Sequence, residues 1–331
     1  MTGNRDIENK AGNSNTALHN GPALITGAAG FIGANLVRRL VTAGVEVHAL
    51  LRAQSAPWRL AGIEGALHIH ACSLLDEEAL TAVVRRVKPR YIYHLATHGA
   101  YPTQTDADRI IRTNLLGTWN LLRACNQFDY ALLVNTGSSS EYGFKDHAMR
   151  ETDLVEPNSY YAVAKCAQSL LAGWVAHDED RAIVTLRPFA VYGPYEEPSR
   201  LVPTLVRNCL TGRPLELVNP EIAHDFIYID DVLDAYLKTE ELRHHPGEVL
   251  NIGTGMQTSI GEIVETVLRV TGSDVPLRWG AMPARPWDSA IWVADASKAR
   301  RLLGWRARHT LEAGIRKTAE WMRRRLEAPE A

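Results

Sequence analysis

The fold is decided by the stretch Thr26-Gly27-Ala28-Ala29-Gly30-Phe31-Ile32-Gly33, which follows the apolar run Ala23-Leu24-Ile25 and leads into a helix-like segment. Glycine permits a tight turn and lets the backbone approach a pyrophosphate, which the free N–H groups of a helix start can bind. The spacing is GxxGxxG rather than GxGxxG, so an ordinary glycine-rich turn stays open as the alternative. On the dinucleotide interpretation, the cofactor-binding residues of this turn are Gly27, Gly30, Phe31, Ile32 and Gly33.

Composition describes an enzyme-sized globular chain of 331 residues, 46% hydrophobic, with a formal net charge of −2. This charge gives no electrostatic reason to expect nucleic acid or an anionic membrane as a partner. No apolar run approaches the roughly 20 residues that cross a bilayer. The four cysteines have no metal-ligand spacing, so we expect no bound metal and a cytoplasmic protein with reduced, mostly buried thiols. They are Cys72, Cys125, Cys166 and Cys209.

Apolar stretches alternate with amphipathic helical stretches from residue 22 to about residue 190. The predicted strands are 22–27, 45–51, 67–71, 91–95, 131–137 and 182–187. The predicted helices are 31–43, 76–87, 106–127 and 159–178, followed by 200–211, 230–240, 259–271 and 309–324. Such alternation predicts an α/β fold with a Rossmann-type, doubly wound parallel sheet that binds ligands at the carboxyl ends of its strands.

The chain is expected to divide into a leader, a dinucleotide-binding domain and a smaller lobe. Residues 1–20 are polar and lack an apolar signal-peptide core, which predicts a disordered leader. After residue 190, Pro and Gly punctuate shorter segments, which predicts a mixed α/β lobe that binds substrate. The expected boundaries are 21–188 with 226–252 for the Rossmann domain, and 189–225 with 253–325 for the lobe.

A tyrosine and a lysine four residues apart mark a candidate catalytic helix, at Tyr161 and Lys165. On a helix this spacing places both side chains on one face. A nearby ammonium stabilises a phenolate, so the pKa of Tyr161, ordinarily about 10, would fall toward neutrality and allow proton exchange with a sugar hydroxyl. YxxxK also occurs by chance in many helices. Tyr160 competes for the role, although the lysine stands at the right offset from Tyr161.

A hydroxyl-rich loop, TGSSSEYG at 136–143, follows the apolar run Ala131-Leu132-Leu133-Val134. Hydroxyls at the carboxyl end of a parallel strand can donate to a substrate oxygen. The alternative is a Ser/Thr-rich loop whose side chains bond the local backbone.

In this order and spacing, the three elements resemble the extended short-chain dehydrogenase/reductase family, in particular its nucleotide-sugar epimerases, dehydratases and ketoreductases. The resemblance covers roughly residues 22–325. It is also carried by the further blocks His94-Leu95-Ala96, NLLGT at 114–118, RPFAVYGP at 187–194, HDFIYIDDV at 224–232, NIGTG at 251–255 and Leu303-Gly304-Trp305.

The resemblance implies a catalytic triad in which Ser138 bonds the reacting oxygen and Tyr161 is the acid/base. Lys165 would hold the nicotinamide ribose and lower the pKa of Tyr161. Further cofactor contacts are implied at Ser73, Leu74, Leu95, Ala96, Asn114 and Pro188.

Substrate contacts map less cleanly, since Ala190 and His224 stand where relatives carry Asn and Arg. The implied contacts are Ser139, Ser140, Ala190, Arg200, His224, Arg285 and Asp288. Arg285 suits a pyrophosphate because its guanidinium is bidentate, with a solvated loop arginine as the alternative. The loop 98–104 is expected to face the hexose, which adds His98 and Tyr101, unless it is only a rigid polar loop.

One departure from the family concerns dehydration. Dehydratases of the family carry acids one and two places after the catalytic Ser/Thr, where this chain has Ser139 and Ser140. The acid, Glu141, comes one step later. One step on a turn or strand reverses the direction of a side chain. We therefore expect Glu141 to be structural.

A second departure concerns the cofactor. The strand 45–51 ends without the acid that accepts from an adenosine 2′-hydroxyl, and Arg52 follows it. An arginine can pair with a 2′-phosphate, and Arg59 is a possible second clamp. Ser73 replaces an acid often found near the adenine. The pattern favours NADP(H), with NAD(H) beside a surface Arg52 as the alternative.

A cofactor consumed at each turnover favours a reductase, because an epimerase returns the hydride that it takes. We expect a 4-ketoreductase of nucleotide-4-keto-6-deoxyhexoses, with a UDP-hexose-type 4-epimerase as the main alternative. A dehydratase or a catalytically silent NADP-binding regulator is less favoured. The resemblance also implies a two-fold homodimer through the helices at 106–127 and 159–178.

Overall fold

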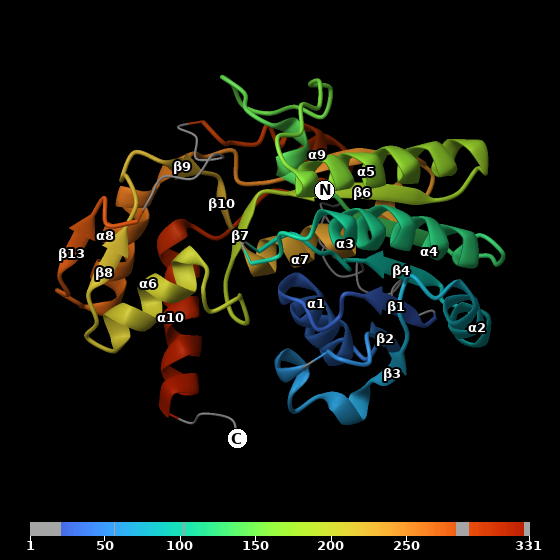
Figure 1. The fold of residues 1–331 in the computed structure, drawn as a ribbon, viewed down its shortest axis with the longest axis horizontal. Helices are drawn as coiled ribbons and strands as arrows, with labels where there is room; N and C mark the ends of the chain where they lie inside the picture. The colour runs from blue at the N-terminus through green and yellow to red at the C-terminus, as the bar shows by residue number, and fades with distance from the viewer. Residues whose placement is uncertain (1–20, 56, 102, 283–290, 328–331) are drawn as a thin grey trace, which may run out of the picture.

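A seven-stranded parallel sheet forms the centre of the computed structural model, which describes residues 21–55, 57–101, 103–282 and 291–327 (Figure 1). All neighbouring strands in it are parallel. Their spatial order is β3 (His68–Ala71), β2 (Val47–Leu51), β1 (Ala23–Thr26), β4 (Tyr91–His94), β5 (Leu132–Thr136), β6 (Ile183–Pro188) and β11 (Val249–Ile252). The chain reverses its direction of travel across the sheet between β1 and β4, so ligands are expected at this switch point. The predicted Rossmann-type fold is confirmed.

Helices cover both faces of the sheet, and the two apolar cores follow from strand alternation. Leu24 and Ile25 are neighbours on β1, yet they belong to different clusters because successive side chains point to opposite faces. One face carries α1 (Phe31–Thr42) and α7 (Ile229–Lys238). The other carries α2 (Glu77–Val87), α4 (Gly117–Cys125) and α5 (Tyr160–Asp178).

The predicted helix 106–127 is interrupted in the structure. It consists of α3 (Ala107–Ile111), a π-helical turn at Arg112–Leu116, and α4. Periodicity does not distinguish a π-helical turn from an α-helix, because one added residue shifts the phase only locally. The other predicted strands and helices are present, with ends shifted by a few residues.

The smaller lobe packs three helices together, α6 (Leu201–Leu210), α8 (Ile260–Thr271) and α10 (Leu311–Glu327), at the left of Figure 1. Its short strands pair two by two, as β10–β7, β12–β9 and β13–β8. These strands are β7 (Ala190–Tyr192), β8 (Leu215–Leu217), β9 (Ala223–His224), β10 (Phe226–Tyr228), β12 (Thr258–Ser259) and β13 (Leu277–Trp279).

Two segments depart from the predicted domain division. Residues 226–252 were expected in the Rossmann domain, and β11 does join the main sheet. β10, however, pairs with β7 outside that sheet. Conversely, α9 (Ser297–Leu303), expected in the lobe, packs against β11. The chain thus crosses between the two parts more often than a boundary drawn from composition allows.

Two expectations about the chain as a whole can be compared with the described residues. All four cysteines are buried free thiols, as expected. Among the described helices, none has the length and apolar character needed to cross a bilayer. The predicted leader, 1–20, lies outside the described residues.

Candidate active site

The glycine turn after β1 is shaped for close backbone approach. Gly27 has φ +68°, and a Cβ there would lie 2.5 Å from the backbone nitrogen of Ala96. A Cβ on Gly33 would lie 2.2 Å from the carbonyl oxygen of Gly27, so α1 packs directly on the turn. Gly30 caps α1 without a side-chain hydrogen bond, and the first turn, which includes Phe31 and Ile32, has no acid. Its N–H groups therefore suit an anion, and the turn fits a dinucleotide pyrophosphate.

A buried row of hydrogen-bonded polar side chains lies beside this turn, at the switch point of the sheet. Thr26 Oγ1 accepts from Ala96 N at 3.2 Å and lies 2.7 Å from His94 Nδ1. His94 Nε2 lies 2.8 Å from Thr118 Oγ1, which donates to Asn114 O at 2.6 Å. Burial lowers the pKa of His94 to about 3, so the ring is neutral. Its two nitrogens link Thr26 to Thr118. The loop at Leu95 and Ala96 is thereby fixed against the turn.

Asn114 supports the loop after β4. It lies in the π-helical turn, fully buried. Its Oδ1 accepts from His98 N at 2.8 Å, and its Nδ2 donates to His98 O at 2.8 Å. The Asn114 side chain therefore positions the loop at His98, and its direct contact with the cofactor stays a prediction.

The proposed triad comes together at the carboxyl edge. Tyr161 stands in the first turn of α5, which Ser159 caps. The hydroxyls of Ser138 and Thr97 are near enough to the phenol to lower its pKa, against the effect of burial. Sequence reasoning missed Thr97, which also donates to Asn114 Oδ1 at 3.2 Å.

The expected effect of Lys165 on Tyr161 is wrong for this structure. Burial raises the pKa of Tyr161, although the hydroxyls of Ser138 and Thr97 oppose this rise. Lys165 Nζ donates to Thr136 O at 2.7 Å and to Gln168 Oε1 at 3.0 Å. Burial lowers the pKa of Lys165 to about 8, so the ammonium persists at neutral pH. Helical spacing put the lysine on the right face, but it could not show which acceptors the sheet offers.

Glu141 is structural, as expected. It is fully buried and accepts from Ser138 N at 2.8 Å and from Ser169 Oγ at 2.9 Å. Its other oxygen accepts from Arg187 Nε at 2.9 Å and lies 2.8 Å from Arg187 Nη2. Burial raises the pKa of Glu141, and the Arg187 guanidinium lowers it. The carboxylate thus ties the serine loop to β6 and α5.

The two serines after Ser138 differ in role. Ser139 is buried, and its Oγ accepts from Trp292 Nε1 at 3.1 Å, so its hydroxyl supports the loop. Sequence reasoning missed Trp292. Ser140 is half-buried, and its N–H donates to Ser138 Oγ at 3.1 Å. A substrate contact from either serine stays a prediction.

The adenosine end of the site is exposed. Arg52, directly after β2, is exposed and contributes to the lowering of the His98 pKa, which burial dominates. Ser73 is exposed and accepts from Leu75 N at 3.2 Å, whereas Leu74 is buried. A cofactor contact of Arg52, Ser73 and Leu74 stays a prediction.

The second clamp proposed at Arg59 is wrong. Arg59 is buried and donates to Tyr195 O at 2.7 Å and to Glu197 Oε2 at 3.0 Å. It also donates to Ala29 O at 3.4 Å. Its guanidinium braces the glycine turn.

Several predicted substrate residues gather where the lobe meets the sheet. The pKa of Tyr101, raised by burial, is influenced by both Arg200 and Glu196. Arg200 Nε lies 3.9 Å from Glu196 Oε1. Sequence reasoning missed Glu196, a buried carboxyl whose pKa burial raises to about 8.

The remaining predicted residues have diverse surroundings. Pro188 ends β6, and Ala190 N donates to Asp225 O at 3.0 Å. His224 packs its ring edge-on against Phe226 and Trp292. Arg285 and Asp288 lie outside the described residues.

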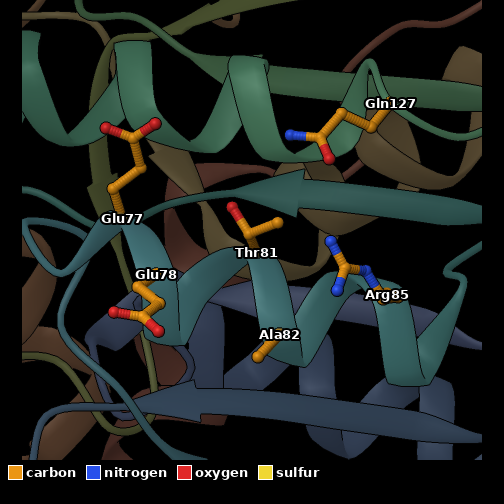
Figure 2. Close-up of a pocket in the computed structure, with 6 residues that line it drawn as sticks. All are labelled: Glu77, Glu78, Thr81, Ala82, Arg85 and Gln127. Atoms are coloured by element: carbon orange, nitrogen blue, oxygen red, sulfur yellow. The ribbon is translucent and has the colours of Figure 1, made fainter.

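A surface hollow of about 640 Å³ lies away from these groups, over α2 (Figure 2). None of the predicted site residues lines it. Its lining residues are Glu77, Glu78, Thr81, Ala82, Arg85 and Gln127. The carboxyl edge, where the triad and the glycine turn meet, is therefore the better-supported active site.

A parallel Rossmann sheet with serine, tyrosine and lysine at its carboxyl edge defines an enzyme of the extended short-chain dehydrogenase/reductase class. The NAD dependent epimerase/dehydratase family matches residues 23–253, and the chain belongs to this family.

Known proteins match the chain over most of their length. A probable dTDP-glucose 4,6-dehydratase of Sinorhizobium fredii is 28% identical, with 90% of this chain and 91% of that protein covered. A UDP-glucose 4-epimerase of Mycolicibacterium smegmatis is 29% identical, with 91% and 98% covered. A solved structure of MoeE5 in complex with UDP-glucose and NAD is 34% identical, with 92% of this chain and 100% of that chain covered, and has a TM-score of 0.82. MoeE5 is also known with UDP-glucuronic acid and NAD.

Proposed function

We propose that this enzyme is an NAD-dependent 4-epimerase of UDP-hexoses or UDP-hexuronates. The observation that carries the proposal is the Tyr161–Ser138–Thr97 hydroxyl cluster beside a fully committed Glu141. Epimerisation at C4 needs one group that removes and returns a proton. Elimination of water needs a further acid or base, and the described serine loop provides no free carboxylate for that step. This favours epimerisation over the dehydratase relatives.

The residues support a division of labour at C4. Tyr161 Oη takes the proton from the C4 hydroxyl and returns it, while the Ser138 hydroxyl orients the same oxygen. Bound NAD supplies the reversible hydride acceptor, and the positive charge of its oxidised form favours the Tyr161 phenolate. An ammonium has three donors, and two of those on Lys165 are used by Thr136 and Gln168, which leaves the third for a ribose hydroxyl.

The ligands of MoeE5, UDP-glucose, UDP-glucuronic acid and NAD, support this choice of substrate and cofactor. The two sugars differ at C6, so a positive side chain near C6 would distinguish them. Arg200 is the candidate, because it is the exposed N-cap residue of α6 and its charge acts on Tyr101 and Glu196.

A 4-ketoreductase that uses NADPH remains the second candidate. The observation in its favour is Arg52, an exposed arginine at the end of β2 where an NAD-specific site is expected to carry an acid. The two functions differ in whether the reduced cofactor is consumed.

The deciding experiment incubates purified enzyme with UDP-glucose, UDP-glucuronic acid and dTDP-glucose, with NAD or with no added cofactor, and with a dTDP-4-keto-6-deoxyhexose in the presence of NADPH. The products are analysed by chromatography. An epimerase gives the C4 epimer of a UDP-sugar without net NADH. Stoichiometric NADPH oxidation with a 4-keto-6-deoxyhexose nucleotide would establish the reductase instead. Formation of that keto sugar from dTDP-glucose would identify a dehydratase.

We also propose a cytoplasmic two-fold homodimer through α4 and α5. Two apolar residues of these helices belong to the protein's own core, since Leu122 is buried in it and Leu171 packs against it. Trp119, Leu170 and Trp174 are 37%, 64% and 67% exposed. An apolar surface of this kind is typical of an interface. Light scattering should give a dimer for the wild type and a monomer for Trp174→Glu, whereas a wild-type monomer at micromolar concentration would contradict the proposal.

A further inference from the structure

Four polar side chains lie together on or next to strands β2 and β3, which are neighbours at one end of the sheet in Figure 1. The parallel register pairs His48 with His68. Since side chains two residues apart share a face, Glu46 and His70 join them on that face. His48 is buried, whereas Glu46 and His68 are more than half exposed, at 56% and 61% of their side chains.

Three of these side chains bring ligand atoms close together, and the rings of His48 and His68 stack with their centroids 4.6 Å apart. Glu46 Oε1 lies 2.9 Å from His48 Nε2 and 3.9 Å from His68 Nε2. All three atoms lie within 4.8 Å of one another. Zinc bonds to nitrogen and oxygen are about 2.0–2.2 Å, which places the ligands of a tetrahedral ion about 3.4 Å apart. The exposed side chains of Glu46 and His68 would have to rotate, and the His68 ring to leave its stack on His48, for the three atoms to reach this spacing.

We propose that Glu46, His48 and His68 form a binding site for a divalent transition metal, with Zn²⁺ as the best-fitting ion. Two imidazoles and one carboxylate are ligands that Zn²⁺ accepts, whereas Mg²⁺ and Ca²⁺ prefer oxygen alone. The fourth position stays open to water. The ion would join the edge strand β3 to β2 independently of catalysis.

A second set of hydrogen bonds determines which ring nitrogens carry protons in the metal-free site. Arg86 Nη2 lies 2.8 Å from His70 Nδ1, and arginine only donates, so His70 carries its proton on Nε2. That proton is donated to His48 Nδ1 at 2.9 Å. The proton of neutral His48 then lies on Nε2 and is donated to Glu46.

Metal binding reverses this order. The ion needs the lone pair of His48 Nε2, so the His48 proton moves to Nδ1 and is donated to His70 Nε2. The His70 proton moves to Nδ1, which ends the contact with Arg86. The number of protons on the two rings is unchanged. Arg86 therefore opposes metal binding, and its removal should strengthen it.

The first test is a competition titration of tag-free full-length protein with Zn²⁺ against a chromophoric chelator. Loss of one of three ligands should weaken binding in His68→Ala by about 100-fold, and His244→Ala, an exposed histidine elsewhere, should bind like the wild type. Zinc should also raise the Tm of the wild type and not that of His68→Ala. Equal Zn²⁺ affinity of the wild type, His68→Ala and His244→Ala would contradict the proposed site.

The second test compares Arg86→Ala with Arg85→Ala. Both arginines stand in the last turn of α2, but Arg85 lines the hollow of Figure 2. Arg86→Ala should bind Zn²⁺ several-fold more tightly than the wild type, and Arg85→Ala should not differ. Unchanged or weaker binding by Arg86→Ala overturns the role given to Arg86.

Discussion

The two ends of the carboxyl edge hold their polar side chains in different ways. Around β5 and α5, Glu141 and Lys165 are almost completely buried, and each has several hydrogen-bond partners. At the ends of β2 and β3, Arg52 and Ser73 are exposed on loops. The proposed catalytic Lys165 and the structural Glu141 are thus built into the core, whereas the residues expected to select the cofactor are not.

This difference separates two kinds of change. Altering a buried charged group leaves its partner without compensation and costs stability. Altering an exposed loop residue costs little stability, so cofactor preference can change while the fold and the triad stay the same. The comparison predicts which variants lose folding, which lose turnover and which only exchange one cofactor for another.

The largest effect is expected for Glu141→Ala. It leaves the buried Arg187 guanidinium without its carboxylate, which typically costs about 3–5 kcal/mol. Urea denaturation should show this loss, with Ser73→Ala as a control within about 0.5 kcal/mol of the wild type. If Glu141→Ala were as stable as the Ser73→Ala control, the buried groups around β5 and α5 would contribute no more to stability than the exposed loops after β2 and β3.

Tyr161→Phe should lower turnover by about 100-fold or more, the scale expected for a positioned acid/base. The fold and the cofactor affinity should change little, because the phenol is not a main anchor of the cofactor. Tyr160→Phe is the matched control, since Tyr160 is 63% exposed on the same helical turn. Near wild-type turnover of Tyr161→Phe would remove it from the mechanism and direct attention to Tyr160.

Arg52→Ala tests the second candidate function, the NADPH-dependent reductase. If Arg52 binds a 2′-phosphate, one charge-assisted contact of about 1.5–3 kcal/mol corresponds to roughly 10- to 150-fold in affinity. The variant should lose that much NADPH affinity and keep NADH affinity, as measured by fluorescence titration. Equal binding of both cofactors by the wild type, or NAD that co-purifies, would instead strengthen the epimerase proposal.

The smallest effect is expected from pH. The pKa of Lys165 is lowered to about 8, so the ammonium loses its charge as the pH rises through that value. Cofactor affinity should therefore fall several-fold between pH 7 and pH 9, because the amine is a weaker donor than the ammonium. The affinity of Lys165→Met should already be low and flat over this range, and a wild-type affinity that is equally flat would contradict the role of Lys165.

Periodicity and motif spacing predicted much of this protein correctly. The strand–glycine–helix stretch predicted β1 and α1, and alternation predicted the other five strands from β2 to β6. A single position was also predicted correctly, since the offset of Glu141 from Ser138 indicated a structural side chain and its hydrogen bonds agree. Such conclusions depend on local geometry, which neighbouring residues determine.

Only the tertiary structure decided which residues that are distant along the chain contact one another. The π-helical turn at Asn114, the contact of Trp292 with Ser139, and the commitment of Arg59 to Tyr195 and Glu197 join segments that no periodicity connects. The pKa of Tyr161 was likewise decided only by the tertiary structure. Helical spacing places Lys165 on the correct face of α5, but burial and the hydroxyls of Ser138 and Thr97 govern the phenol. The sequence alone therefore determined which elements form and which residues reach the carboxyl edge. Desolvation and long-range hydrogen bonds, which exist only after packing, decided how those residues are charged and held.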